Sequence, residues 1–238
     1  MINYSKMFLF LTSITLFVSC GGDVGWWFGE GNVNIEDSLE INTIKVDVKS
    51  DSPISLPDRL LAASVTVYVY NKEKKIMQSG SGVFVKDNII ATNFHVIDGG
   101  YYFRILRNLE ENKIDAQLYK FDKNHDVALL KIEQSFPNNV LDLTNKLPGV
   151  GIEIWVAGSP VGLTGSLSNG IVSSIRKNLP YDFDLIQITA PISPGSSGGP
   201  VVNMAGEIIG IVVSNIGGDQ TQGLNFAVPA KYVDFLLQ

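Results

Sequence analysis

The chain has 238 residues, of which 45% are hydrophobic, 23 are glycine and one is cysteine, and its formal net charge is −6 at pH 7. This length and composition support a globular, turn-rich and largely β protein with its own hydrophobic core. The acidic balance, without a dense basic stripe, excludes nucleic acid as a partner, and the single cysteine excludes an intramolecular disulfide.

The chain begins with a segment typical of protein export. One cation, Lys6, precedes an apolar or hydroxylic run from Met7 to Val18, which is too short to span a bilayer core of about 30 Å and suits a signal peptide. The run is followed by Ser19-Cys20, and small residues before a cysteine resemble the bacterial lipobox, although Phe17 stands where leucine is usual. We therefore predict a signal peptide over residues 1–19 and lipidation of Cys20. An ordinary secretory signal and an uncleaved anchor are the alternatives.

Residues 20–56 shift in composition to Gly, Asp, Glu, Asn and Ser, which predicts a lipidated N-terminus followed by a flexible acidic tether. Such a tether holds a folded domain clear of a membrane of the bacterial cell envelope, on its periplasmic or its outer surface. Trp26 and Trp27 interrupt this segment. Three placements are open for the pair: the lipid headgroup region, a contact between protomers, or a local hydrophobic cluster against the domain.

From Pro57 onward, short apolar runs bounded by turn residues predict one all-β domain over residues 57–238. A short helix is expected first, at residues 58–63. The first set of strands is expected at residues 64–70, 76–86, 88–92, 101–107, 113–120 and 127–133. After a connection at 137–148, the second set is expected at 153–157, 170–175, 185–189, 201–202, 208–214 and 225–228, followed by a terminal helix at 229–238. The expected fold is two six-stranded antiparallel β-barrels with a cleft between them.

The heptapeptide Pro-Gly-Ser-Ser-Gly-Gly-Pro at residues 194–200 predicts a nucleophile at Ser197. Its glycines let the backbone reach conformations closed to other residues and leave room for an approaching carbonyl. A serine hydroxyl needs a base, and the chain contains only His95 and His125. His95 lies where an apolar strand ends and a short helical turn begins, and Asp126 opens an apolar run that half-buries its carboxylate. We predict His95 as the base and Asp126 as its carboxylate partner.

Each of these residues has a simpler interpretation when it is taken alone. Gly-Ser-Ser-Gly-Gly is commonly a flexible turn, His95 a hydrogen-bonded histidine at a strand end, and Asp126 a carboxylate at a turn or strand start. Their joint occurrence in the order His, Asp, Ser, which chymotrypsin-type enzymes share, favours a catalytic triad. His125 is the competing base. Because adjacent strand residues face opposite sides, we expect His125 to face solvent while Asp126 points into the site.

Four blocks of sequence resemble the HtrA (DegP-like) family of bacterial serine proteases. They are Gly-Ser-Gly-Val-Phe-Val at 80–85, Thr-Asn-Phe-His-Val at 92–96, Asp-Val-Ala-Leu-Leu-Lys at 126–131 and Gly-Ser-Ser-Gly-Gly-Pro at 195–200. The resemblance extends over residues 57–238 and implies the trypsin-type, two-barrel fold, with the triad assembled between the barrels. We expect no cofactor and no metal. Many members of the family continue into PDZ domains, whereas this sequence stops after the expected terminal helix, so we expect none.

By this resemblance, the oxyanion hole is expected at Gly195, Ser196 and Ser197, with the N–H groups of Gly195 and Ser197 as its donors. The substrate pocket is expected at Pro191, Ile192, Val213, Ser214 and Asn215. In trypsins that cut after Lys or Arg, the residue six before the nucleophile is Asp. Here that residue is Pro, which predicts a preference for small or medium apolar side chains at P1. The position before the nucleophile is Asp in zymogen-activated relatives and usually Asn in HtrA relatives; here it is Ser, so activation by an inserted N-terminus is not expected.

Together these features predict a serine endopeptidase that acts through an acyl-enzyme on exported, unfolded or damaged proteins. The expected partners are polypeptide substrates and, through the N-terminal lipid, a membrane. Trimers are common in the family, but these residues give a homotrimer no independent support. Two alternatives stay open: a catalytically silent lipoprotein that uses the protease fold as a binding or scaffold module, and a V8-like glutamyl endopeptidase, which requires a pocket suited to Glu.

Overall fold

The computed structural model of the protein describes residues 54–108, 110–159, 165–177, 182–213 and 224–238. The predicted signal peptide, Cys20, Trp26, Trp27 and nearly all of the predicted tether lie outside these described residues, as do Ser214 and Asn215 of the predicted pocket. Within the described ranges, every helix is too short or too polar to cross a bilayer.

Helix α1 (Leu56–Ala63) opens the described domain and starts two residues before the predicted helix. Its start is set by Ser55 and Pro57: the Ser55 hydroxyl accepts a hydrogen bond from the Asp58 N–H at 3.3 Å, and proline suits the first turn because its missing N–H needs no partner there. Leu60 and Ala63 are fully buried. The helix therefore packs one apolar face against the barrels.

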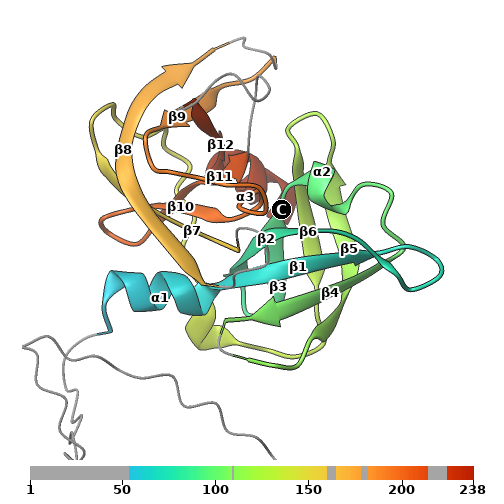
Figure 1. Ribbon diagram of the computed structural model, residues 1–238. Coiled ribbons are helices and arrows are strands. Elements are labelled where there is room, and N and C mark those ends of the chain that lie inside the picture. The colour runs from blue at the N-terminus through green and yellow to red at the C-terminus, as the bar shows by residue number, and fades with distance from the viewer. Residues whose placement is uncertain (1–53, 109, 160–164, 178–181, 214–223) are drawn as a thin grey trace, which may run out of the picture. The chain divides into compact units, whose positions relative to one another are not determined.

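The first six strands close into an antiparallel barrel in the order β1-β2-β3-β6-β5-β4, with β1 pairing β4 to complete the ring (Figure 1). Alternating valines explain β1, because Val65, Val67 and Val69 point into the barrel and are buried. The strands of this barrel are β1 (Ser64–Tyr70), β2 (Ile76–Lys86), β3 (Ile89–Thr92), β4 (Tyr102–Arg107), β5 (Ile114–Asp122) and β6 (Val127–Lys131).

The last six strands close into a second antiparallel barrel, in the order β10-β11-β12-β9-β8-β7. Its interior is filled by aliphatic side chains such as Ile154, Ile186 and Ile188, all fully buried. Its strands are β7 (Glu153–Gly158), β8 (Ser166–Arg176), β9 (Leu185–Ile188), β10 (Pro200–Asn203), β11 (Ile208–Val213) and β12 (Asn225–Pro229). The 3-10 turn η1 (Pro137–Asn139) lies in the connection between the barrels, and helix α3 (Ala230–Leu237) ends the chain.

A further apolar cluster joins the two barrels with helices α1 and α3. It includes Leu60 of α1, Leu129 of β6, Ile211 of β11 and Val233 of α3, each fully buried. Burial of this shared core fixes how the two barrels lie against each other, so residues carried by different barrels keep a defined separation.

The predicted fold class, two six-stranded antiparallel barrels and a short C-terminal helix, is confirmed. The largest difference in a strand boundary is in β8, which begins at Ser166 instead of residue 170 and forms the long curved strand in Figure 1. Residues 166–169 lack a continuous apolar run, and their strand conformation comes from pairing with β7, where Gly158 lies opposite Ser166. Tertiary pairing therefore extends this strand beyond its sequence signal.

Packing of the shared core predicts that the mutant Ile211→Ala loses about 2–5 kcal/mol of unfolding free energy, because it leaves a cavity where the side chain has no exposed surface. The matched control is Ile171→Ala in β8, whose side chain is 40% exposed; this change should cost about 1 kcal/mol or less. Urea denaturation measures both values. Equal losses in the two variants would contradict the assigned core.

Candidate active site

His95 sits on the four-residue helix α2 (Phe94–Ile97), directly after β3. The two residues that follow it, Val96 and Ile97, are buried in the core of the first barrel and anchor the helix. The side-chain amide of Gln78 donates to the carbonyls of His95 and Val96 at 3.2 and 2.7 Å. The imidazole itself is 46% exposed. A fixed backbone therefore presents a ring that a substrate can reach.

Asp126 holds His95 at two points. Its Oδ1 accepts from the His95 backbone N–H at 2.8 Å, and its Oδ2 lies 2.7 Å from the ring Nδ1. The amide of Asn93 donates to the Asp126 carbonyl at 2.9 Å, and the Asp126 side chain is only 11% exposed. Because a carboxylate only accepts hydrogen bonds, Nδ1 carries the proton, and in the neutral ring Nε2 is the free base. The sequence-predicted pair is thus in contact.

The backbone at Asp126 adopts the left-handed conformation, with φ of 54°. Asp is among the few residues with a side chain that tolerate this region. The residue precedes β6 and ends a turn in which its N–H lies 3.4 Å from the Lys123 carbonyl. The positive φ turns the carboxylate toward α2 instead of continuing the alternation of the strand.

A tight turn leads into the predicted nucleophile. The Ser196 N–H donates to the Ser193 carbonyl at 2.9 Å, Pro194 occupies the second position, and Gly195 has φ of 96° at the third. This combination is a type II β-turn, which requires a positive φ at its third residue. The Ser196 hydroxyl also accepts from the Ser193 N–H at 3.3 Å, so the side chain of Ser196 belongs to the turn.

The loop that carries Ser197 docks against the first barrel. The Ser81 N–H of β2 donates to the Ser197 carbonyl at 2.7 Å. A Cβ built on Gly80 would lie 3.1 Å from the same carbonyl oxygen and 2.7 Å from a methyl of Val96, the residue after His95. Ser197 is 5% exposed. The chain thus brings the serine of the second barrel to the part of the first barrel that carries His95.

The predicted substrate pocket is described only in part. Pro191 is exposed and its carbonyl accepts from the Ser168 hydroxyl at 2.7 Å, whereas Ile192 packs against the core of the second barrel. Val213, at the end of β11, is 4% exposed. The three described members are uncharged, so they present apolar surface beside the turn.

The prediction that His125 faces solvent is wrong. Its ring Nδ1 lies 2.5 Å from the Asp122 carboxylate, and the ring stacks on Tyr232 of α3 with centroids 4.0 Å apart. The alternation rule fails because Asp126 is not in an extended conformation, and α3 covers the ring. Partial burial alone would raise the pKa of Asp122, but hydrogen bonds from His125 and from the Asn124 N–H hold that pKa below its ordinary value. His125, whose side chain is 32% exposed, therefore fastens α3 to the turn before Asp126.

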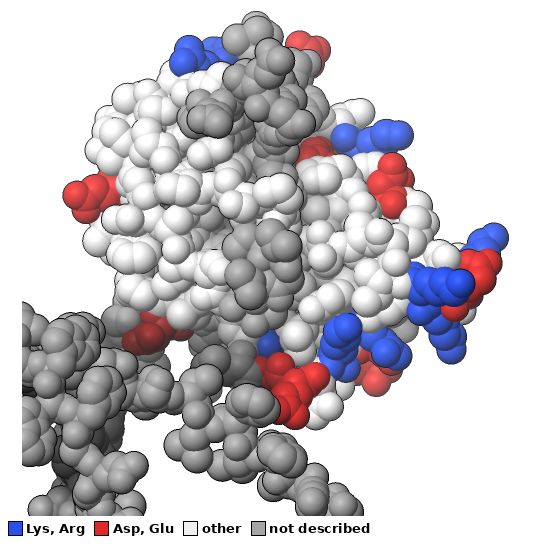
Figure 2. Space-filling model, viewed as in Figure 1, with Lys and Arg blue, Asp and Glu red and all other residues white. Residues whose placement is uncertain are grey.

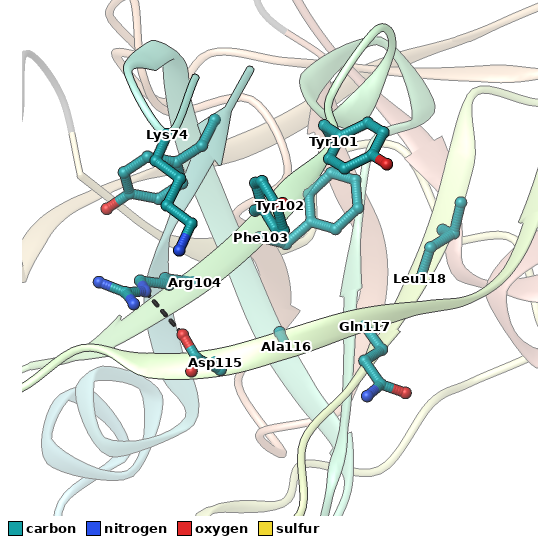
Figure 3. A pocket seen from close by; sticks show the side chains of 10 residues that line it. Lys74, Tyr101, Tyr102, Phe103, Arg104, Asp115, Ala116, Gln117 and Leu118 are labelled. Carbon is teal, nitrogen blue, oxygen red and sulfur yellow. Dashed lines mark hydrogen bonds and ion pairs between the residues drawn. The ribbon is translucent and has the colours of Figure 1, made fainter. Parts of the chain in front are cut away.

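A cavity of about 550 Å³ lies elsewhere on the first barrel, between the β1–β2 turn, β4 and β5 (Figure 3). Tyr101, Tyr102 and Leu118 form much of its wall, and Arg104 is paired with Asp115 at 2.6 Å. None of the predicted site residues lines this cavity. Among the described residues, no three His, Cys, Asp or Glu side chains gather closely enough to hold a metal ion.

The fold and these contacts define a class of protein. Two closed six-stranded antiparallel barrels, with a His–Asp pair on the first and a glycine-flanked serine on the loop of the second, form a chymotrypsin-type, trypsin-like structure. The sequence matches the trypsin-like peptidase domain over residues 80–211, which is more than half of the chain. The chain belongs to this family.

Its relatives include DegP-like proteins. The chain is 38% identical over 166 residues to a probable periplasmic serine endoprotease of Pseudomonas savastanoi and 34% identical over 160 residues to one of Rhizobium meliloti, covering 67% and 64% of this chain and 34% and 31% of those proteins. It thus spans about a third of their length. The crystal structure of the serine endoprotease from Yersinia pestis superposes with a TM-score of 0.66 at 29% identity, covering 79% of this chain and 66% of that one.

The docking of the loop predicts that Gly198→Ala is severely destabilising. Gly198 has φ of 88°, and a Cβ there would lie 2.1 Å from the Ser81 carbonyl oxygen and 2.3 Å from the Thr92 hydroxyl. Gly151 is the matched control, because it has φ of 90° but nothing within 4 Å of its Cβ position. We expect Gly151→Ala to cost about 1–2 kcal/mol of unfolding free energy from backbone strain alone.

Gly198→Ala should cost about 1–3 kcal/mol more than this control, because overpacking is added to the same strain. Urea denaturation of both variants measures the difference. Equal free energies of unfolding in the two variants would show that the loop does not contact β2 as closely as described.

Proposed function

We propose that the protein is a serine endopeptidase that uses His95, Asp126 and Ser197. The Ser197 Oγ attacks a peptide carbonyl while His95 Nε2 removes its proton; the C–N bond then breaks as His95 gives that proton to the leaving amine. The resulting acyl-enzyme is hydrolysed by water, which His95 activates in turn. The observation that carries the proposal is the two-point contact between His95 and the buried carboxylate, which places the proton of the neutral ring on Nδ1 and leaves Nε2 to act as the base.

The oxyanion hole in this proposal consists of the N–H groups of Gly195 and Ser197, with Ser196 between them. The type II turn supports it, because a positive φ at Gly195 sets the direction of that N–H independently of the chain before Pro194. Fixed donors stabilise the negative charge that develops on the carbonyl oxygen, and the loss of one typically lowers the rate about 10²- to 10³-fold.

The proposed substrates are polypeptides of the exported compartment, unfolded or damaged, that carry a small or medium apolar side chain at P1. Pro191, Ile192 and Val213 bring no charge to pair with Lys or Arg. On the face shown in Figure 2, charged side chains lie mostly at the rim of the described surface and its centre is largely uncharged.

The periplasmic location named for the relatives supports export of this chain too. A signal peptide over residues 1–19, a lipidated Cys20 with a tether over residues 20–56, and a protease domain over residues 57–238 belong to the same proposal.

Replacement of the nucleophile tests the enzyme against the silent-scaffold alternative. A fluorophosphonate probe should label the wild-type protein and fail to label Ser197→Ala, whose peptide hydrolysis should fall on the order of 10⁶-fold. The exposed neighbour Ser193 supplies the control Ser193→Ala, which should keep labelling. His95→Ala should lose activity like Ser197→Ala, whereas His125→Ala should not. Hydrolysis that persists undiminished in Ser197→Ala would refute the assigned nucleophile, and a wild-type protein that is never labelled would support the scaffold.

The uncharged pocket predicts the cleavage preference. In a panel of peptides that differ only at P1, we expect kcat/KM for Val, Ala or Leu to exceed that for Lys or Arg by about 10- to 100-fold, because a cation would lose its hydration without gaining a counter-charge. A peptide with Glu at P1, included in the panel, distinguishes this pocket from that of a V8-like glutamyl endopeptidase. A preference for Lys, Arg or Glu would refute the proposed pocket while leaving the triad intact.

A further inference from the structure

Three buried side-chain hydroxyls form a chain behind the loop that carries Ser197. The Thr66 hydroxyl of β1 donates to the Ser159 hydroxyl at 2.6 Å, the Ser159 N–H donates to the Ser81 hydroxyl at 2.9 Å, and the Ser81 hydroxyl donates to the Gly195 carbonyl at 2.7 Å. Thr66 and Ser81 are fully buried and Ser159 is 4% exposed. This chain of hydrogen bonds thus crosses from the first barrel to the loop of the second through buried residues.

Ser81 is the member of this chain that touches the loop, and it does so twice. Its hydroxyl binds the Gly195 carbonyl, and its backbone N–H binds the Ser197 carbonyl at 2.7 Å. Its own carbonyl accepts from the Thr92 hydroxyl at 2.7 Å, just before the segment with His95. One residue of β2 therefore holds the backbone on both sides of Ser196 and joins it to the segment that carries His95.

The direction of the Ser81 hydroxyl is determined by its neighbours. The Ser159 backbone N–H can only donate, so it occupies a lone pair of the Ser81 oxygen and leaves the hydroxyl proton for the Gly195 carbonyl. Without this donor the half-buried Gly195 carbonyl loses its hydrogen-bond partner, which favours rotation of the loop. Gly195 has no side chain to resist such rotation.

The two carbonyls lie on either side of the peptide unit that carries the Ser197 N–H, and the first of them belongs to the turn that carries the Gly195 N–H. Peptide units are planar, so a bond to the Gly195 carbonyl fixes the Gly195–Ser196 unit, and a bond to the Ser197 carbonyl fixes the unit after Ser197. Between these two fixed units lie the φ and ψ angles of Ser196 and Ser197. With both ends held, the Ser197 N–H, which lies in the unit between them, is restrained. The Gly195 N–H belongs to the preceding Pro194–Gly195 unit, and it is restrained through the turn, which the Ser196 N–H of the first fixed unit closes on the Ser193 carbonyl at 2.9 Å.

We propose that Ser81 is a positioning residue for the oxyanion-binding N–H groups of Gly195 and Ser197. This inference rests on the proposed function. Ser81 is buried and does not touch substrate, and its hydroxyl acts by keeping the Gly195 carbonyl turned toward β2, and with it the turn that directs the Gly195 N–H. A preorganised oxyanion hole needs no rearrangement during the reaction, so loss of this tether raises the barrier to the chemical step and leaves ground-state binding unchanged.

The test compares Ser81→Ala with Thr66→Val in the full chain. Both changes remove one fully buried hydroxyl from the same chain of hydrogen bonds, but only Ser81 contacts the loop. Valine keeps the shape of the Thr66 side chain, and the bond lost in Thr66→Val is the one to Ser159. For a peptide substrate with apolar P1, we expect Ser81→Ala to lower kcat by about 10-fold or more with KM unchanged. Thr66→Val should keep kcat within about 3-fold of the wild-type value, although its free energy of unfolding falls about as much as that of Ser81→Ala.

A second measurement separates positioning from general destabilisation. A peptide aldehyde, which forms a tetrahedral adduct with its oxyanion in the hole, should bind Ser81→Ala more weakly by the same factor as the fall in kcat. A non-covalent peptide inhibitor should bind both variants as it binds the wild type. If Ser81→Ala does not unfold cooperatively, the same comparison is made with Ser81→Cys, whose S–H is a weak donor of nearly the same size.

The outcomes keep the two proposals apart. If the wild-type protein hydrolyses peptides and Ser81→Ala keeps its kcat and aldehyde affinity, the role of Ser81 is overturned and the triad stands. Equal losses of kcat in Ser81→Ala and Thr66→Val also overturn it, because they indicate a general effect of the buried hydroxyls. If the wild-type protein neither cleaves peptides nor reacts with a fluorophosphonate, the proposed function fails and the inference fails with it.

Discussion

The contact between the loop 193–199 and β2 is the constraint on which the site depends. The candidate base and its carboxylate belong to the first barrel and the candidate nucleophile to the second, so their chemistry requires the two barrels to meet closely at this loop. The space is so small that a Cβ on Gly198 would lie 2.1 Å from the Ser81 carbonyl oxygen of β2. Within the second barrel, a Cβ on Gly199 would lie 2.1 Å from the Ala157 carbonyl oxygen of β7. Glycine is therefore required at both positions because a side chain would collide with the backbone, whatever the flexibility of the loop. The shared apolar core of barrels and helices keeps this close approach in place.

The two histidines show how surroundings assign different roles to the same side chain. Both bind a carboxylate through Nδ1, His95 to Asp126 and His125 to Asp122. His95 stands on a short helix with its side chain 46% exposed, so the ring remains accessible. His125 lies against Phe183 and Tyr232, which cover its ring. The first pair is the one proposed for proton transfer, and the second fastens the C-terminal helix to the turn before Asp126.

Much of the fold could be predicted from the sequence because most strands coincide with alternating or continuous apolar residues, as in β1 and β11. The start of β8 could not, because Ser166 to Asn169 carry no such run and become a strand only by pairing with β7. Of the site, His95 and Asp126 were predicted and lie in contact. The solvent-facing His125 was a wrong prediction, since alternation assumes an extended backbone and Asp126 has φ of 54°. Asn93 and Ser81 lay inside recognised sequence blocks, but no local signal distinguishes a positioning amide or hydroxyl from any other.

What the sequence by itself determined is local: the apolar alternation of the strands, the Pro194-Gly195 pair suited to a type II turn, and the candidate residues with their order along the chain. Only the tertiary structure decided which groups meet. The Ser81 hydroxyl reaches a carbonyl 114 positions away, and Thr66 reaches Ser159 across 93 positions. The physical reason is that periodicity and turn chemistry act between neighbours in the chain, whereas a buried polar group takes whichever partner the packing of two barrels brings within hydrogen-bonding distance.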